Sequence, residues 1–190
     1  MSVLACAELV RRGDPDRFLS AMLTPPDAAR LDRLVQARRW DVYRDAFEDA
    51  AHFDEYIDAT AGHLMWTAAR ALGAATGELA VRDFAYAAGV ANWLMAIPEL
   101  EARGRFPLVD GRPDSVAALA DSALMRLKKS RASRRDVPKA ARAALLAGWR
   151  AEPVLKLARA EPAAVAEGRL GGSEFARRAG LLRASLSGRW

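Results

Sequence analysis

The sequence is poor in the residues that build β-sheets and covalent cross-links. Its one cysteine, Cys6, excludes an internal disulfide and a zinc site made of several thiolates, and it fits a reducing compartment. Isoleucine is scarce, so β-branched residues are too few to supply a sheet. Alanine and leucine, both strong helix formers, are abundant instead. The composition therefore predicts an all-α fold.

Long apolar runs are also lacking. The longest stretch without a charge, residues 84–98, is shorter than the roughly 20 residues that a membrane-spanning helix needs. The apolar residues before Cys6 are too few for a lipoprotein signal, and no basic segment precedes them. We therefore expect a cytoplasmic protein that is at most peripheral to the inner membrane.

The length and composition of the chain are typical of a single folded domain. The 190 residues are 52% hydrophobic and 28% charged, which favours a single helical domain over residues 1–190. The net charge of +5 suits an anionic partner, although a coding bias towards arginine explains it equally well. The densest basic run comprises Lys128, Lys129, Arg131, Arg134, Arg135 and Lys139. It is either a solvated face or a contact with an acidic membrane. Without interleaved aromatic residues, it does not predict nucleic-acid binding.

Apolar residues three to four apart predict a series of helices. We expect them over residues 4–12, 18–23, 27–35, 48–72, 79–102, 114–129, 139–149, 153–160 and 173–187. Asp27 is expected to cap the third, and a polar joint over residues 38–45 to precede the fourth. Pro98 should kink its helix or remove one hydrogen bond. The five tryptophans are expected mainly in the core, although an exposed group of them would mark an interface.

Acidic residues four apart are the only candidates for a metal site. Asp45 with Asp49, and Asp54 with Asp58, each form an aspartate-x-x-x-aspartate pair that could hold a divalent cation on one helix face. A solvated face is the more common reason for this spacing in so charged a chain, so we predict no metal. His52 and His63 are expected on opposite sides of their helix, and neither has a nucleophile at a catalytic spacing.

Two stretches of the sequence resemble the squalene/phytoene synthase family of helical prenyl transferases. The first, residues 56–65, has Tyr56 ahead of an Ala61-Gly62 step and Met65, as in the family helix that lines the active-site cavity. The second, residues 89–108, resembles the family's second aspartate-rich helix. It retains Asn92 and the turn Arg103-Gly104-Arg105.

The same resemblance identifies what the chain lacks. Ala96 and Leu100 stand where the family carries two aspartates that bind magnesium ions and neutralise the substrate diphosphate. The family's earlier aspartate motif has no counterpart, because a helical segment is missing near residue 30. The resemblance implies a shortened class I isoprenoid synthase fold with a remnant cavity. The residues implied for that cavity are Tyr56, Ala61, Gly62, Met65, Asn92, Ala96, Leu100, Arg103 and Arg105.

The expected function is therefore that of an inactive relative of the prenyl synthases. Residues 145–150 and 188–190 resemble non-enzymatic members, one of which assists respiratory complex I assembly, so we expect a protein partner and no cofactor. One alternative is an active prenyl transferase of the phytoene or squalene synthase type. It would use Mg²⁺ and prenyl diphosphates, with the aspartate pairs as replacement ligands. The other alternative is a protein that binds an isoprenoid or lipid in the remnant cavity.

Overall fold

Helices alone form the regular structure of the described residues. The computed structural model describes residues 24–43, 45–187 and 190, and this part of the chain contains no strand, which confirms the all-α prediction. The helices predicted over residues 4–12 and 18–23 lie outside it. In chain order the α-helices are α3 (Pro25–Tyr43), α4 (Ala50–Ile57), α5 (His63–Ala71), α6 (Glu78–Ala102), α7 (Pro113–Ala132), α8 (Ala151–Ala160), α9 (Ala163–Ala166) and α10 (Glu174–Ser187). Four shorter or tighter elements join them: η1 (Asp58–Gly62), η2 (Arg134–Asp136), η3 (Ala140–Gly148) and η4 (Arg169–Gly171).

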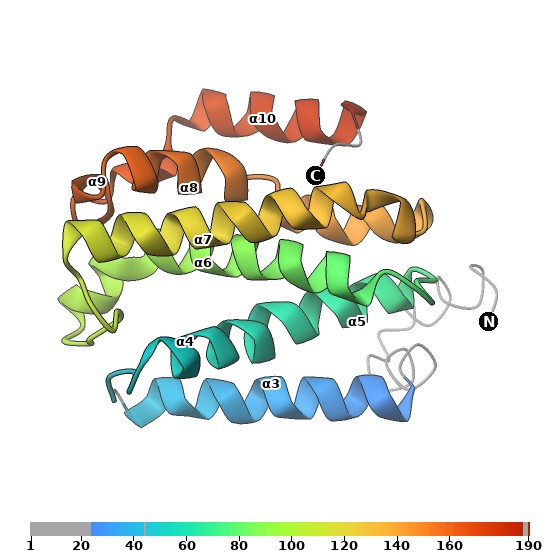
Figure 1. The fold of residues 1–190 in the computed structure, drawn as a ribbon, viewed down its shortest axis with the longest axis horizontal. Helices are drawn as coiled ribbons and strands as arrows, with labels where there is room; N and C mark the ends of the chain where they lie inside the picture. Colours follow the sequence, from blue (N-terminus) through green and yellow to red (C-terminus); the bar gives the residue numbers. More distant parts are fainter. Residues whose placement is uncertain (1–23, 44, 188–189) are drawn as a thin grey trace, which may run out of the picture.

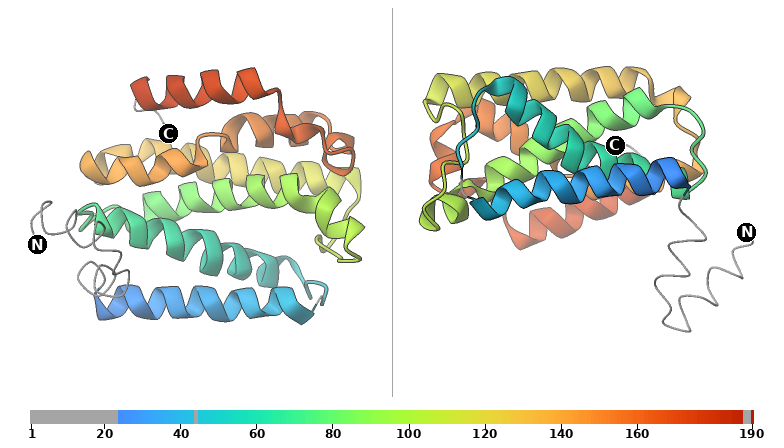
Figure 2. Two further views of the ribbon diagram at one scale, coloured as in Figure 1. Left: turned by 180° about the vertical axis from the view of Figure 1, so that it is seen from behind. Right: turned by 90° about the horizontal axis from the view of Figure 1, so that it is seen from below.

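The helices form layers on either side of α6 (Figure 1). One side of α6 contacts α5 and the π-helical turn η1, and α3 packs outside these two. Another side of α6 contacts α7 and α8. Figures 1 and 2 show α3 and α10 at opposite outer edges of the bundle. These two helices therefore present separate surfaces.

The central helix α6 is built from small residues. It begins after Gly77, whose φ of 85° is in the left-handed region that glycine adopts without strain. Alanines from Ala80 to Ala91 are buried along it, so neighbouring helices approach closely. Pro98 lies within the helix, which continues to Ala102. The predicted start and end of this helix are thus confirmed to within one residue.

Two glycines mark the closest helix contacts. A Cβ added to Gly89 would lie 2.8 Å from the Ala61 Cβ and 2.9 Å from the Ile57 Cγ2. A Cβ added to Gly148 would lie 2.6 Å from the Phe84 ring. The absence of a side chain at these positions sets the distance of α6 from η1 and from η3.

Three predicted elements differ from the structure. The polar joint over residues 38–45 is wrong, because α3 continues to Tyr43 with Arg38 and Asp41 paired one turn apart. The helix over residues 48–72 is interrupted by η1, whose π-helical turn adds a residue to the helical repeat. The segment predicted as an α-helix over residues 139–149 is a 3₁₀-helix instead, η3.

The tryptophans lie mainly in the core, as expected. Trp66, Trp93 and Trp190 are buried, and Trp40 and Trp149 are half-buried. Across the described residues, no helix has the length and apolar character required to cross a membrane.

Candidate functional site

A cleft lies between α3 and the helix formed by α4, η1 and α5. Its volume is about 540 Å³. Arg33 and Trp40 line it from α3, Tyr56 from α4, His63 from α5 and Arg82 from α6. Cationic and aromatic side chains thus face the same space. Of the residues implied for the remnant cavity, Tyr56 alone is among those that line this cleft.

Tyr56 is the most constrained side chain of the cleft. Its hydroxyl donates a hydrogen bond to Asp41 Oδ1 at 2.9 Å and accepts one from Arg38 at 2.9 Å. The guanidinium of Arg105 lies 3.5 Å from the same Asp41 carboxylate. Burial raises the pKa of Tyr56, the Arg38 charge opposes that shift, and the hydrogen bond to Asp41 adds to it. The tyrosine is therefore held neutral, as a link between α3 and α4.

Arg105 connects this link to the predicted Arg-Gly-Arg turn. Its side chain is 12% exposed and lies over the Trp40 ring, 5.3 Å from the ring centroid. Arg103, in contrast, is exposed and pairs with Glu99 on its own helix. The turn therefore brings one of its two arginines to the edge of the cleft.

Aromatic rings fill the space beneath Tyr56. Trp40 stacks on Phe47 with ring centroids 4.3 Å apart, and Trp93 lies 5.2 Å from the Tyr56 ring. The indole N–H of Trp93 donates to the Pro107 carbonyl oxygen at 2.7 Å. Trp40 and Tyr56, which line the cleft, are thus backed by a cluster of packed rings.

The π-helical turn positions an acid beside the cleft. Gly62 leaves room for the Asp58 side chain, because a Cβ at Gly62 would lie 2.5 Å from Asp58 Oδ1. Asp58 accepts a hydrogen bond from Arg82 Nε at 3.0 Å. The Thr60 hydroxyl donates to the Tyr56 carbonyl oxygen at 2.7 Å. Gly62, one of the residues implied for the remnant cavity, thus faces this carboxylate, and the close helix approach occurs at Gly89.

Both histidines line the cleft, which corrects the prediction that they lie on opposite sides. Eleven residues make about three helical turns and return to the same face, so the predicted separation was wrong. His63 is 6% exposed. Burial lowers its pKa, and the Arg82 charge lowers it further, against a smaller opposing effect of Asp58. His63 is therefore neutral at pH 7.

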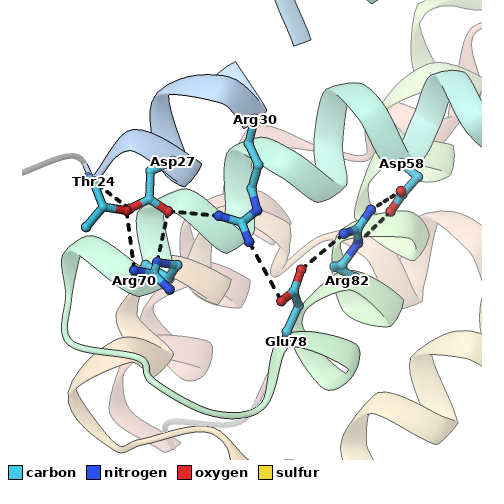
Figure 3. Close-up of polar contacts among 7 residues, drawn as sticks. All are labelled: Thr24, Asp27, Arg30, Asp58, Arg70, Glu78 and Arg82. Atoms are coloured by element: carbon cyan, nitrogen blue, oxygen red, sulfur yellow. Dashed lines mark hydrogen bonds and ion pairs between the residues drawn. The ribbon is translucent and has the colours of Figure 1, made fainter. Parts of the chain in front are cut away.

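A buried carboxylate anchors a network of polar contacts that reaches Asp58 and Arg82 of the cleft (Figure 3). Asp27 is 2% exposed and lies 2.8 Å from Arg70 Nε and 3.1 Å from Arg30. Burial raises the pKa of Asp27, but hydrogen bonds from Thr24 and the two arginines outweigh it, so the net pKa is lowered. The Thr24 N–H donates to Asp27 at 3.1 Å, as in a capping box. Asp27 is thus inside the first turn of α3 and does not precede it as the predicted cap.

The network continues from α3 into the cleft. Arg30 lies 4.0 Å from Glu78, and Glu78 lies 3.1 Å from Arg82, which binds Asp58. Figure 3 shows these groups as one chain of alternating charges. The Thr24-Pro-Pro-Asp27 pattern could have indicated its beginning, but the partners lie too far apart in sequence to be inferred.

The four aspartates named as metal candidates do not converge. Asp45 is exposed in the segment before α4, and Asp49 caps α4 through the His52 N–H, so these two do not share a helix face as expected. Asp54 accepts a hydrogen bond from the Tyr86 hydroxyl and lies 3.3 Å from Arg126. Among the described residues no three histidine, cysteine, aspartate or glutamate side chains form a group that could hold a metal ion.

The remaining residues implied for the cavity are dispersed. Asn92 is exposed on α6, whereas Ala96 and Leu100 are half-buried, and Leu100 packs against the core. Met65 also packs against the core, and Ala61 faces Gly89. Ala96 and Leu100 therefore place apolar side chains at the two positions of α6 to which the resemblance assigns aspartates.

Comparison with known protein families gives a match to part of the chain. Residues 11–109, just over half of the chain, match the family model described as squalene/phytoene synthase. This region includes α3 to α6 and the Arg103-Gly104-Arg105 turn. A search of curated proteins and a search of solved structures each gave no match.

Proposed function

This chain belongs to the squalene/phytoene synthase family, and we propose that it is a non-catalytic member that acts by binding a protein partner. The observation that carries the proposal is the side-chain chemistry of α6. Ala96 and Leu100 occupy the positions at which the sequence resemblance places a metal-binding aspartate pair. Neither side chain has an oxygen atom that could coordinate Mg²⁺.

The carboxylates of Asp41 and Asp58 do not replace that pair. Asp41 is engaged by Tyr56 and Arg105, and Asp58 is engaged by Arg82. A magnesium ion would have to displace these arginines, and the arginines would then repel it. The residues present therefore do not fit the magnesium ions of prenyl transfer.

An apolar surface beside the cleft favours a protein partner. Val42 and Tyr43 end α3 with 75% and 70% exposure, and Phe106 follows α6 with 70% exposure. The Asp41–Arg105 ion pair connects the two segments that carry them. Exposed aromatic and aliphatic residues around a charged pair are typical of protein interfaces. A role in respiratory complex I assembly is one form of this proposal, and it rests on sequence resemblance alone.

The test combines an activity assay with a binding assay. Diphosphate release from farnesyl and geranylgeranyl diphosphate is measured with and without Mg²⁺, on protein shown to be folded by circular dichroism. We expect no release above background, and the partner should be retained by the native chain and by Leu79→Ser but lost with Phe106→Ser. Leu79 is a suitable control because it is 77% exposed on α6, away from this surface. Magnesium-dependent release would instead support an active prenyl transferase and overturn the proposal.

A second candidate function is binding of an isoprenoid or lipid with an anionic head. The cleft of about 540 Å³ favours it, since the Trp40 and Tyr56 rings would face the chain and Arg33 would face the head. Saturable binding of farnesyl diphosphate without Mg²⁺, weakened by Arg33→Glu, is the expected result. Binding that is unchanged in this variant would exclude the cleft as the site.

A further inference from the structure

We propose that α10 and the basic grooves beside it form a docking surface for an acidic phospholipid bilayer. Figures 1 and 2 show α10 as an outermost element, on the side of the bundle opposite α3. This surface is therefore separate from the cleft and from the apolar surface at the end of α3.

The outward side of α10 is an apolar stripe. Phe175, Leu182 and Leu186 are 83%, 60% and 80% exposed. Their spacing of seven and four residues places them on one face of the helix. A folded chain in water gains nothing from exposing three large apolar side chains on one face, so the stripe suits a partner that covers it.

The inward side of α10 is fixed to the bundle. A Cβ at Gly180 would lie 2.3 Å from the Trp149 ring, so this glycine marks the line of contact. Gly180 lies about 140° around the helix from Phe175 and about 160° from Leu182, by 100° per residue. Trp190 is 3% exposed and packs edge-on against Phe84, with ring centroids 5.3 Å apart. The stripe is thus held outward by a helix that is already docked.

Positive charge borders the stripe on one side. A groove of about 410 Å³ is lined by Arg134, Lys139 and Arg142 together with Leu146, Leu186 and Trp190. No acidic side chain is among the described residues that line it. Arg142 is held in place, because it donates hydrogen bonds to the carbonyl oxygens of Val137 and Arg134 at 3.0 and 3.1 Å. The groove can therefore receive an anionic group beside the apolar Leu186 side chain.

More positive charge lies in a second groove, which adjoins the first because Arg134 and Trp190 line both. It is also lined by Arg183, Arg131 and Lys156, with Glu152 as its acidic member. Glu152 pairs with Arg131 at 2.6 Å and with Lys156 at 2.7 Å. Arg183 makes no ion pair that the structure records among the described residues. Both grooves beside α10 thus carry cationic side chains.

This combination of charge and apolar surface indicates which kind of partner binds at α10. A second copy of the chain would bring two sets of cations together, which is unfavourable. A nucleic acid would neutralise the cations but leave the apolar stripe in water. An acidic bilayer satisfies both features, because its head groups meet the cations while Phe175, Leu182 and Leu186 enter the boundary of the acyl chains. Lys139 and Arg134 also belong to the basic run noted in the sequence, and the structure brings them to α10.

The test is vesicle flotation of the full chain. We expect it to float with vesicles of phosphatidylcholine mixed with phosphatidylglycerol, and to stay with the soluble fraction when phosphatidylcholine is used alone. Raising the salt concentration should weaken binding. Lys139→Glu and the double variant Phe175→Ser/Leu182→Ser should each reduce partitioning on the order of tenfold. These three side chains are exposed, so the variants should keep the native circular dichroism spectrum and Tm.

Matched controls come from exposed residues outside α10 and the grooves beside it. Arg39→Glu on α3 repeats the charge reversal, and Leu79→Ser repeats the loss of an exposed apolar side chain; neither should change flotation. Equal binding to neutral vesicles, or equal losses in the controls, would overturn the proposal. Full competition by soluble glycerol phosphate would show an anion site without bilayer contact. A concentration-dependent dimer lost in Phe175→Ser/Leu182→Ser would identify a second copy as the occupant, and either result would also overturn it.

Discussion

The hydroxyl of Tyr56 donates a hydrogen bond to Asp41 at 2.9 Å and so joins α4 to α3. The Asp41 carboxylate also forms ion pairs with two guanidinium groups, that of Arg105 at 3.5 Å and that of Arg38 at 3.1 Å. One half-buried carboxylate therefore connects α3, α4 and the turn after α6. The resemblance to the family identified Tyr56 and Arg105, but not the acid that links them.

Removal of the Tyr56 hydroxyl tests this link. We expect Tyr56→Phe to lower the free energy of unfolding by about 1–2 kcal/mol, because the hydroxyl loses its partly buried hydrogen bonds with both Asp41 and Arg38. Asp41→Ala should cost about 2 kcal/mol, since it also leaves Arg105 and Arg38 without their shared partner. Urea unfolding measures both. A double-mutant cycle that gives additive effects would contradict the link, and Tyr43→Phe, at an exposed tyrosine, is the control.

Asp27 makes stability dependent on acid pH. Its pKa lies below the ordinary value of 3.8, so the unfolded chain binds the proton more tightly. The contribution of ionised Asp27 to the free energy of unfolding is complete above about pH 4. It is lost as the pH falls through the pKa that Asp27 has in the folded protein. We expect Asp27→Asn to destabilise the protein by about 2 kcal/mol at pH 7, and the difference from the native chain to shrink in acid. Thermal unfolding between pH 7 and 3 measures this. Asp32→Asn, at an exposed acid of the same helix, should change little.

His63 should titrate below its ordinary value of 6.5. Burial, and after it the Arg82 charge, disfavour the protonated ring in the folded state. Because the unfolded chain binds this proton more tightly, stability should decrease as the pH falls below 6.5. NMR titration of the His63 ring gives the pKa directly. A titration midpoint at or above pH 6.5 would show that the ring is hydrated, which would contradict its 6% exposure.

Gly89→Ala tests the contact between α6 and η1. The added methyl group would lie 2.8 Å from Ala61 and 2.9 Å from Ile57, so one element must move. We expect a net loss of about 1–3 kcal/mol in the free energy of unfolding, despite the better helix propensity of alanine. Gly111→Ala is the matched control, because nothing lies within 4 Å of its added Cβ. Ala61→Gly should partly rescue the Gly89→Ala variant.

The sequence predicted the fold better than the site, for identifiable reasons. The boundaries of α6 follow from Gly77 before it and from a long run of small and apolar residues. The extension of α3 to Tyr43 was missed because its charged residues resembled a linker, whereas Arg38 and Asp41 pair along the helix. The Asp27–Arg70 pair joins residues that are distant in sequence, so no local pattern could predict it. Ala96 and Leu100 could be interpreted only through the family resemblance.

The π-helical turn at Asp58–Gly62 also sets the phase of the helix on either side of it. The turn holds one residue more than an α-helical turn does, and this residue is accommodated without a break in the helix. Deletion of one residue from it would let the turn close as α-helix and keep Trp66 facing the core, but the widened turn in which Asp58 lies against Gly62 would be lost. Deletion of one residue from α4 or from the start of α5 would instead rotate the side chains on the two sides by about 100° relative to one another. The shape of the cleft therefore depends on the number of residues in this turn as well as on the side chains that line it.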